Sequence, residues 1–308
     1  MYDTVNFWID KADISGGNPF GVLPYLSEIT ERQNERQGYS CTGKLKDYII
    51  NVNENGISLK GSLAKSFFEN NIITLTRQTT EQAIEMLSDN LHTDVRNAKI
   101  TRIDISTVIP TKRPPSDYYP YLGIKPYFTR LQSTPDTLYY NNHQKQIIFY
   151  DKIKEAKVKN VQIPDVYQNS NLFRYELRYT KHLKRQLNIN LTASKLYETE
   201  FYRSVIWSWY TEFKSIQKIK ENNFMIEENT TLKKAKESIL AYALQQLGAE
   251  FIDQAISEAK AKKALNNRSD YTRLKADLNK MVVAKFCNNS ELINALENDI
   301  FSIARHAR

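Results

Sequence analysis

The chain has 308 residues, of which 41% are hydrophobic and 25% charged, a composition typical of a folded globular protein rather than a disordered one. No run approaches the roughly 18 apolar residues that a membrane span needs, and the first residues lack the layout of a signal peptide, so we expect no membrane contact. Cys41 and Cys287 lie far apart, which argues against a disulfide framework or a zinc ribbon and favours a reducing cytoplasm. The net charge of +8 favours an anionic partner such as nucleic acid.

The first third of the chain mixes strand, turn and helix patterns. Residues 4–10 alternate apolar and polar side chains, which predicts a first strand, whereas the polar segment 28–40 is typical of either helix or loop. Residues 46–51 and 56–60 predict a hairpin. The apolar residues that follow Thr79, a good N-cap, recur at helical spacing and predict a helix.

Three short strands are predicted in the middle of the chain, at 101–107, 145–151 and 172–178. The second of them forms a predicted hairpin with 137–140. Between the first strand and this hairpin, residues 110–126 are rich in proline and tyrosine and predict a loop. The basic and aromatic side chains of this loop suit either contact with DNA or an inert connector.

Helical periodicity replaces alternation from residue 192 onward, in segments 198–220, 231–247, 249–265, 271–286 and 291–305. Hairpins are visible and a regular alternation of strands and helices is not, which favours antiparallel pairing. We therefore expect an α+β fold, a mainly antiparallel sheet with helices packed on one face, in residues 1–190. An all-helical domain, residues 191–308, is expected to follow and to contribute DNA binding or dimer contacts.

Two of the three central strands each carry one carboxylate among apolar residues, Asp104 in the first and Glu176 in the third. If the strands are neighbours, both carboxylates converge on one face near Tyr150, at the end of the middle strand. Carboxylates at close quarters repel, so one would be protonated unless a cation joined them. Oxygen ligands select a hard divalent ion, which predicts Mg²⁺ or Mn²⁺ held by Asp104 and Glu176.

This arrangement suits phosphodiester transfer, in which the metal polarises a phosphate oxygen and a tyrosine hydroxyl attacks in line. The attack by Tyr150 would keep the cut DNA as a phosphotyrosine ester. Lys152 or Lys154 would lower the pKa of the tyrosine or stabilise the leaving oxygen. The alternative is structural: Glu176 forms an ion pair with Arg102, and Tyr150 is an ordinary tyrosine at a sheet end.

Other patterns narrow the function classes further. The four histidines form no closely spaced pair, and His143 is either a third ligand or an exposed turn residue. The glycine patterns of nucleotide-binding loops are missing, which argues against an ATPase or a nicotinamide enzyme. A basic run after the third strand is either a solvated helix face or a phosphate contact. The predicted DNA-binding side chains are Arg102, Arg174, Arg178, Lys181, Lys184 and Arg185.

Four segments in this order resemble the replication initiators of filamentous phages and related plasmids, the gene II/X type, over residues 55–190: 57–65, 102–104, 150–155 and 173–178. Members of that family are similar to HUH endonucleases in function. They nick one strand of a double-stranded origin through a tyrosine, leave a 3′-hydroxyl for the host polymerase, and later rejoin the displaced circle. The resemblance places the nucleophile at Tyr150, and Asp104 and Glu176 match other recurrent positions. The chain departs from the histidine pair of HUH enzymes.

The expected function is that of a rolling-circle replication initiator, a metal-dependent site-specific DNA endonuclease and strand transferase. Its expected partners are the double-stranded origin, the single-stranded product and host replication proteins, with a homodimer left open. A relaxase or a transposase would use the same chemistry. A non-catalytic basic DNA-binding protein would instead show DNA affinity with strong salt dependence and no nicking. A second nucleophile is also left open, with four candidates: Tyr139, Tyr140, Tyr179 and Tyr202.

Overall fold

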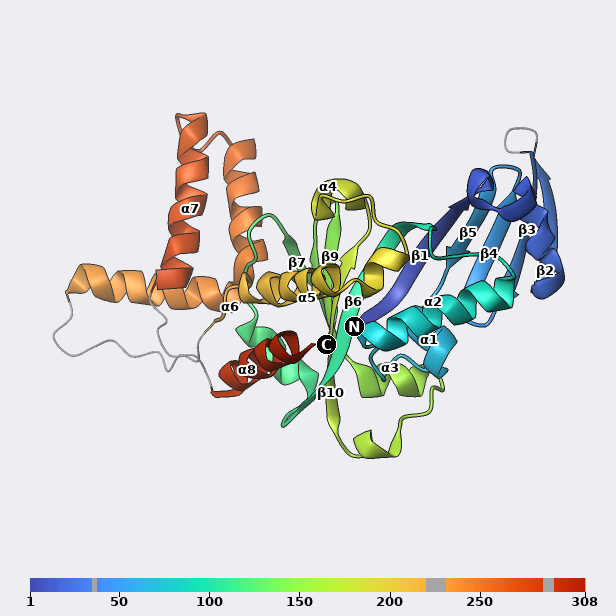
Figure 1. The fold of residues 1–308 in the computed structure, drawn as a ribbon. Helices are drawn as coiled ribbons and strands as arrows, with labels where there is room; N and C mark the ends of the chain where they lie inside the picture. Colours follow the sequence, from blue (N-terminus) through green and yellow to red (C-terminus); the bar gives the residue numbers. More distant parts are fainter. Residues whose placement is uncertain (35–37, 220–230, 285–290, 308) are drawn as a thin grey trace.

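The structure is a computed structural model that describes residues 1–34, 38–219, 231–284 and 291–307 (Figure 1). Its ten strands form one sheet, with all neighbouring pairs antiparallel, in the order β2-β3-β4-β5-β1-β6-β10-β9-β8-β7. The strands are β1 (Tyr2–Asp10), β2 (Ser27–Asn34), β3 (Gly38–Leu45), β4 (Tyr48–Asn53), β5 (Gly56–Lys60), β6 (Lys99–Thr111), β7 (Thr129–Thr134), β8 (Thr137–Asn141), β9 (Lys145–Asp151) and β10 (Asn171–Tyr179).

The α-helices are α1 (Leu63–Phe68), α2 (Arg77–Leu91), α3 (Lys152–Val158), α4 (Leu183–Leu187), α5 (Thr199–Lys214), α6 (Leu232–Ala261), α7 (Arg268–Ala284) and α8 (Glu291–His306). Short 3-10 helices are η1 (Lys11–Asp13), η2 (Ser15–Gly17), η3 (Pro19–Tyr25), η4 (Pro115–Tyr121), η5 (Asp165–Tyr167) and η6 (Ser194–Tyr197). The predicted α+β class with an antiparallel sheet is therefore confirmed. Within the described part of the chain, no helix is long and apolar enough to cross a membrane.

Most predicted strands are confirmed, but segment 28–40, predicted as helix or loop, contributes to β2 and β3 instead. β2 is an edge strand whose residues are mostly exposed, so it has no alternation of apolar residues to reveal it. Helix α2 begins after Thr76 rather than at Thr79, because these two threonines form a reciprocal capping box. Two predicted helices, 231–247 and 249–265, are the single helix α6.

The sheet consists of two halves that wind alike. β1 lies at its centre, and the chain then runs to the outer edge at β2 and returns through β3 and β4 to β5, beside β1. β6, the other central strand, is followed by the same path from β7 back to β10. Only the second half carries the three strands in which the functional residues were predicted.

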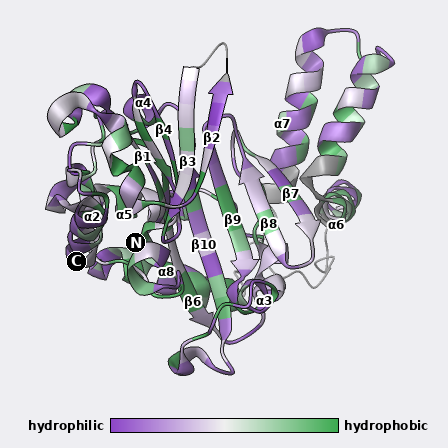
Figure 2. Cartoon of the chain, turned by 90° about the vertical axis from the view of Figure 1, so that its right-hand side faces the viewer, coloured by the Kyte–Doolittle hydropathy of each residue, from purple (hydrophilic) through white to green (hydrophobic). Residues whose placement is uncertain are grey.

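Helices α2, α5 and α8 cover one face of the sheet (Figure 2), whereas α3 packs against part of the other face, where Ile153 contacts the cluster of Val108 and Leu172. The face under α2, α5 and α8 is apolar because strands such as β1 and β4 bury every second residue there, for example Phe7 on β1 and Ile50 on β4. In the second half, Tyr175 stacks on Trp209 of α5 with ring centroids 4.5 Å apart, and donates a 2.7 Å hydrogen bond to the Trp209 carbonyl oxygen. Burial of this aromatic cluster attaches α5 firmly to the sheet.

The predicted domain division at residue 190 does not coincide with an edge of this hydrophobic core. Leu196, Trp209 and Phe213 belong to the same cluster of buried residues as the strands, and so does Ile300 of α8. Helices α6 and α7 have a small cluster of their own, which includes Leu244, Ile252, Ile256 and Tyr271. The helical part of the chain thus divides into helices that complete the sheet domain and a hairpin that packs on itself.

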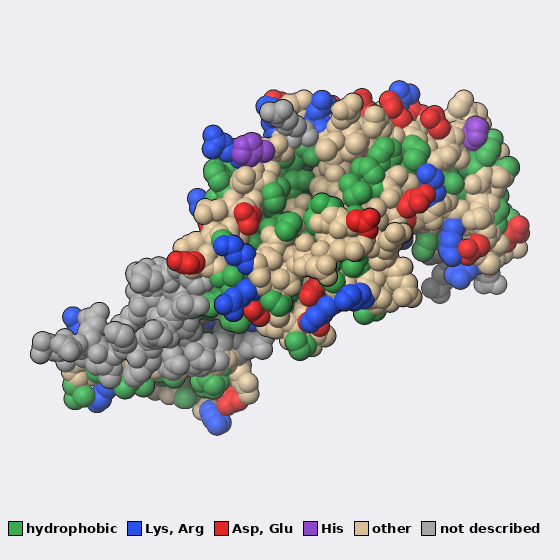
Figure 3. All heavy atoms as spheres, turned by 90° about the horizontal axis from the view of Figure 1, so that it is seen from below, with side chains coloured by type: hydrophobic (Ala, Val, Ile, Leu, Met, Phe, Trp, Pro, Cys, Tyr) green, Lys and Arg blue, Asp and Glu red, His purple; other side chains and the backbone are tan. Residues whose placement is uncertain are grey.

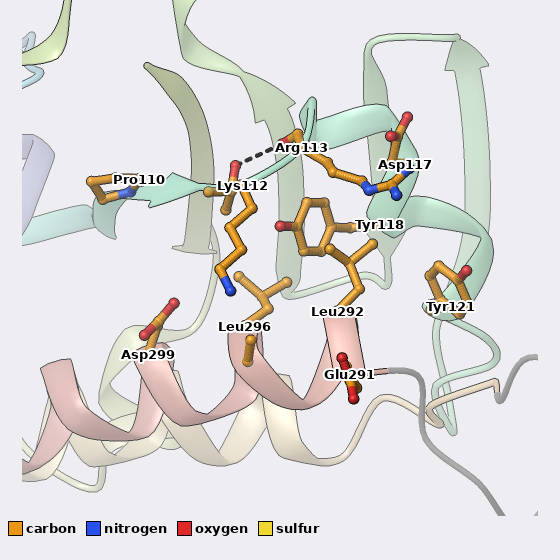
Figure 4. A pocket seen from close by; sticks show the side chains of 12 residues that line it. Pro110, Lys112, Arg113, Asp117, Tyr118, Tyr121, Glu291, Leu292, Leu296 and Asp299 are labelled. Atoms are coloured by element: carbon orange, nitrogen blue, oxygen red, sulfur yellow. Dashed lines mark hydrogen bonds between the residues drawn. The ribbon is translucent and has the colours of Figure 1, made fainter.

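Most of segment 110–126 packs against the rest of the protein. It begins with the last residues of β6 and continues into η4, where Tyr118 is buried and its ring meets Phe173 edge-on. Helix α8 faces it across a pocket in which Leu292 and Leu296 point toward Tyr118, and Lys112 extends toward the helix (Figure 4). Since its aromatic side chains serve the core and this pocket, the segment is not a simple DNA-facing loop.

Candidate functional site

The three strands predicted to form one site are neighbours in the order β6-β10-β9. Along β10, Arg174 lies opposite Tyr150 of β9, and Arg178 lies opposite Asp104 of β6. Glu176, between them, shares their face because alternate residues of a strand point the same way. The sheet therefore brings Tyr150, Asp104 and Glu176 together on the face opposite the one that packs against α5.

Tyr150 lies next to the last residue of β9, and its hydroxyl donates a 2.8 Å hydrogen bond to Oε1 of Glu176. Asp151 follows as the N-cap of α3, so the chain turns into a helix directly after the tyrosine. Burial raises the pKa of the Tyr150 hydroxyl well above its ordinary value, and the charge of Glu176 raises it further. Tyr150 is therefore a neutral phenol at physiological pH and needs a proton acceptor to become a nucleophile.

Glu176 is a buried carboxylate held by two arginines. Its Oε1 accepts from Nε of Arg174 at 3.2 Å, and its Oε2 accepts from Arg178 at 3.0 and 2.7 Å. Burial alone would raise its pKa, but Arg174 and then Arg178 outweigh burial and lower the pKa to about 2. Glu176 is thus charged and is a weak base for Tyr150 as long as both arginines hold it.

Asp104 lies beside the guanidinium group of Arg178, which also holds Glu176. Its two oxygens accept from Arg102 at 2.9 and 2.6 Å, and its Oδ2 lies 3.4 Å from Nε of Arg178. Burial raises the pKa of Asp104 to about 6 although Arg102 and Arg178 oppose the shift. The cation that joins the two carboxylates here is therefore the guanidinium of Arg178.

These donors do not fit a divalent metal ion as they are placed. Both oxygens of Asp104 and of Glu176 already accept hydrogen bonds from arginines. His143 is exposed in the turn between β8 and β9. Within the described ranges, no group of three or more histidine, cysteine, aspartate or glutamate side chains could hold a metal. Binding of Mg²⁺ or Mn²⁺ by Asp104 and Glu176 stays a prediction.

A network of buried hydrogen bonds holds Arg174, and through it Glu176, in position. Arg174, fully buried, donates to Oδ2 of Asp3 at 2.5 Å, to the carbonyl oxygen of Asn71 at 2.6 Å and to Ser106 Oγ at 2.7 Å. Asp3 also accepts from Ser62 Oγ at 2.5 Å. The sequence analysis missed Asp3 and Asn71, because they lie 171 and 103 residues from Arg174 and carry no motif.

The two lysines after Tyr150 have different surroundings. Lys152 is buried, donates to Asn71 Oδ1 at 2.7 Å and Glu155 Oε2 at 2.6 Å, and lies 6.0 Å from the centre of the Tyr150 ring. Burial, followed by the charge of Arg174, lowers the pKa of Lys152. Lys154 is exposed and pairs with Asp136 at 2.5 Å. Only Lys152 is placed to influence Tyr150 directly.

The other predicted residues fall into three groups. Arg102 and Arg178 are partly exposed at the site, with 32% and 28% of their side chains accessible, whereas Arg174 is buried. The exposed basic residues beyond β10 are Lys181, Lys184 and Arg185. Among the other tyrosines, the register places Tyr139 on the face of Tyr150. The remaining three are buried: Tyr140, Tyr179 and Tyr202.

A protein family model matches this chain over residues 1–200, which include the whole sheet and every residue of the candidate site. It describes the N-terminal region of replication-associated proteins of the gene II type, found in phages. No curated protein matches the chain. The match covers more than half of the sequence, and the family that it identifies is the one that the central strands resemble. The chain belongs to the family of phage replication-associated proteins defined by this gene II-type N-terminal region.

Proposed function

We propose that the protein initiates rolling-circle replication by nicking and rejoining one DNA strand at an origin, with Tyr150 as the nucleophile. The observation that carries the proposal is the hydrogen bond from Tyr150 to Glu176, in a polar site flanked by two partly exposed arginines. The family supports a role in replication, and therefore contact with DNA. An HUH-like layout and a cytoplasmic location are parts of the same proposal.

Arg102 and Arg178 are the groups that would receive the scissile phosphate. Each is partly exposed and already engages a carboxylate through charged hydrogen bonds, so a phosphate oxygen can compete for the same donors. A guanidinium aimed at the phosphate would stabilise the charge that develops on its oxygens during transfer. Arg174, which is buried, would keep Glu176 in position rather than touch DNA.

The same competition would activate the tyrosine. As Arg178 turns toward the phosphate, Glu176 loses its strongest partly exposed partner and its proton affinity rises. Glu176 then accepts the proton of Tyr150, the phenolate oxygen bonds to phosphorus, and the bond to O3′ breaks. The proton held by Glu176 passes to the leaving O3′, which gives a 3′-hydroxyl and a phosphotyrosine. Rejoining reverses these steps.

The test is to incubate the protein with supercoiled or single-stranded DNA bearing its own origin, with Mn²⁺ or with EDTA, and to separate products on denaturing gels. We expect a covalent protein–DNA adduct that Tyr150→Phe abolishes and that Tyr139→Phe, the matched control on the same face, retains. An adduct that survives Tyr150→Phe would transfer the role to another tyrosine. Comparison of adduct yields with Mn²⁺ and with EDTA tests the predicted metal dependence. A relaxase or a transposase that uses the same chemistry would show the same dependence.

A second candidate function is non-catalytic DNA binding. It is favoured by the closed ion-pair network, in which each carboxylate of the site already has arginine partners. On this alternative, cognate DNA binds with a strong salt dependence, and neither a nick nor an adduct forms under any metal condition. Intact binding without an adduct would decide for this alternative.

A further inference from the structure

The half of the sheet that lacks the site, β1 to β5, has one face with no helix over it in the described structure. On β1, Phe7 and Ile9 are fully buried while Trp8 between them is half-buried. On β4, Ile50 is fully buried whereas Ile49 is 52% exposed. Helices α1 and α2 contribute to the core on the buried side. The other side is therefore an open sheet face.

We propose that this open face of β1 to β5 binds single-stranded DNA and guides it to the tyrosine site. The inference rests on the proposed function, since it assigns the path of the strand on one side of the cleaved phosphate. The occupant follows from the chemistry of the face and from its continuity with the site.

One row of side chains across the strands suits bases. The register places Ser58 of β5 between Trp8 of β1 and Asn51 of β4, and places Asn51 opposite Thr42 of β3. Asn51 donates to Thr42 Oγ1 at 3.0 Å, so this row is an ordered polar surface. An indole among amide and hydroxyl groups offers a stacking surface with hydrogen-bonding groups beside it.

The neighbouring row suits the phosphate backbone. Lys44 of β3 lies opposite Ile49 of β4, which lies opposite Lys60 of β5. On the next strands, Asn6 of β1 lies opposite Arg102 of β6, which is a residue of the candidate site. Strands are about 4.8 Å apart, so Lys44 and Arg102 are separated by four intervals, roughly 19 Å. The two lysines thus form a row that leads to Arg102, at the β1 side of the candidate site.

Two acidic side chains of this half, Glu28 and Asp10, pair with lysines of the sheet. Glu28 lies 2.5 Å from Lys44, and Asp10 lies 3.8 Å from Lys99, both in exposed pairs that a phosphate can replace at small cost. The face seen from below differs, because acidic and basic side chains are interspersed there (Figure 3). This face presents several strands side by side and no helix that could enter a duplex groove, which favours an unpaired strand over double-stranded DNA.

The test uses full-length protein carrying Tyr150→Phe, so that binding is measured without chemistry, and a fluorescein-labelled oligo-dT followed by anisotropy. Trp8→Leu, which keeps apolar volume but removes the ring, should weaken binding about 5- to 150-fold, corresponding to the loss of one stacked base. Trp8→Phe should restore most of the affinity. The matched control is Trp207→Leu, because Trp207 is 51% exposed on α5 at the helical face.

The lysine row is tested by Lys44→Gln with Lys60→Gln. Both lysines are exposed, so the fold should be unaffected. The slope of log Kd plotted against log salt concentration should fall by about 1.4, which is about 0.7 for each lost phosphate contact. The same change at Lys214 and Lys262, exposed on the helical part, should leave the slope unchanged.

Normal oligo-dT affinity in both Trp8→Leu and the lysine pair would overturn the proposal, as would an equal loss in the controls or the absence of any binding by the parent protein. A duplex that competes as well as the single strand would also overturn it. These outcomes are separate from the adduct assay. Adduct formation with unchanged binding in the variants would reject only the strand path, whereas weakened binding without any adduct would reject only the nicking function.

Discussion

The hydroxyl of Tyr150 donates a 2.8 Å hydrogen bond to Oε1 of Glu176, a carboxylate that two arginines hold charged. The proposed nucleophile therefore already has its proton acceptor in place, but that acceptor is weakened by its partners. Any step that draws Arg178 away from Glu176 strengthens the acceptor. In this arrangement, binding of a phosphate and activation of the tyrosine are coupled through one guanidinium group.

Arg178→Gln should lower the rate of adduct formation, because the loss of one donor to a developing oxyanion, usually about 10²- to 10³-fold, outweighs the gain in basicity of Glu176. Arg178→Lys should recover part of the rate, because it keeps the charge but loses the forked geometry. Single-turnover nicking of origin DNA measures both. Arg203→Gln, an exposed arginine on α5 to which no DNA contact is assigned, is the control and should change the rate little. A wild-type rate in Arg178→Gln would refute the proposed coupling.

Arg174→Met should destabilise the protein by about 3–5 kcal/mol, because it leaves the buried carboxylate of Asp3 without its ion-pair partner. Urea denaturation followed by tryptophan fluorescence measures the loss. Adding Asp3→Asn should cost much less than the sum of the two single changes, since the unpaired charge is then removed. Strict additivity of the two effects would show that the 2.5 Å pair does not contribute as an ion pair.

Glu212→Gln should lower the free energy of unfolding at neutral pH by about 1–3 kcal/mol. It should also make that free energy depend less on pH in the acid range. Glu212 of α5 pairs with Lys125 at 2.8 Å and with Lys145 of β9 at 2.6 Å, so it ties the helix to the sheet. Burial raises its pKa, but the two lysines outweigh burial and depress the pKa below the ordinary 4.5.

The sign follows from this depression. The contribution of Glu212 is complete above its unfolded-state pKa and is lost as pH falls through the lower folded-state value. Denaturation curves recorded from pH 7 downward should therefore show a difference between wild type and Glu212→Gln that shrinks progressively as pH falls below the ordinary value of 4.5. A difference that stays constant across this range would contradict the assignment.

Gly56→Ala should destabilise the first half of the sheet by about 3 kcal/mol. A Cβ atom at Gly56 would lie 2.2 Å from the carbonyl oxygen of Ile9, and the backbone of β1 cannot yield cheaply because it pairs with β5. Gly21→Ala is the matched control, since a Cβ atom there meets nothing within 4 Å. Thermal melts of the two variants compare them, and equal melting temperatures would count against the close approach.

A fragment of residues 1–190 should fail to fold stably, because it exposes the surface of Tyr175 and Phe149 that Trp209 and Phe213 cover. Replacing residues 220–290 by a flexible linker should be tolerated, since it keeps α5 and α8 and removes α6 and α7, which form a cluster of their own. Circular dichroism and denaturation of both proteins provide the measurement. A cooperative unfolding transition in the 1–190 fragment would instead support the predicted domain division.

The sequence by itself determined the strands of the site and the face that each residue occupies, because alternation along a strand has a fixed period. From this alone, Asp104, Glu176 and Tyr150 could be expected to converge if their strands were neighbours. The edge strand β2 escaped prediction because both of its faces are polar. The sequence also did not predict that α5 and α8 pack on the sheet while α6 and α7 pack on each other. An amphipathic helix pattern is the same in both kinds of packing.

Only the tertiary structure decided what surrounds the carboxylates. The register of β6 against β10 places Arg178 between Asp104 and Glu176, so a guanidinium stands where a metal ion was predicted. Asp3 meets Arg174 from the other end of the chain, and β1 to β5 extend the polar face beside the site. Such relationships depend on pairing between distant strands, for which periodicity along one strand carries no information.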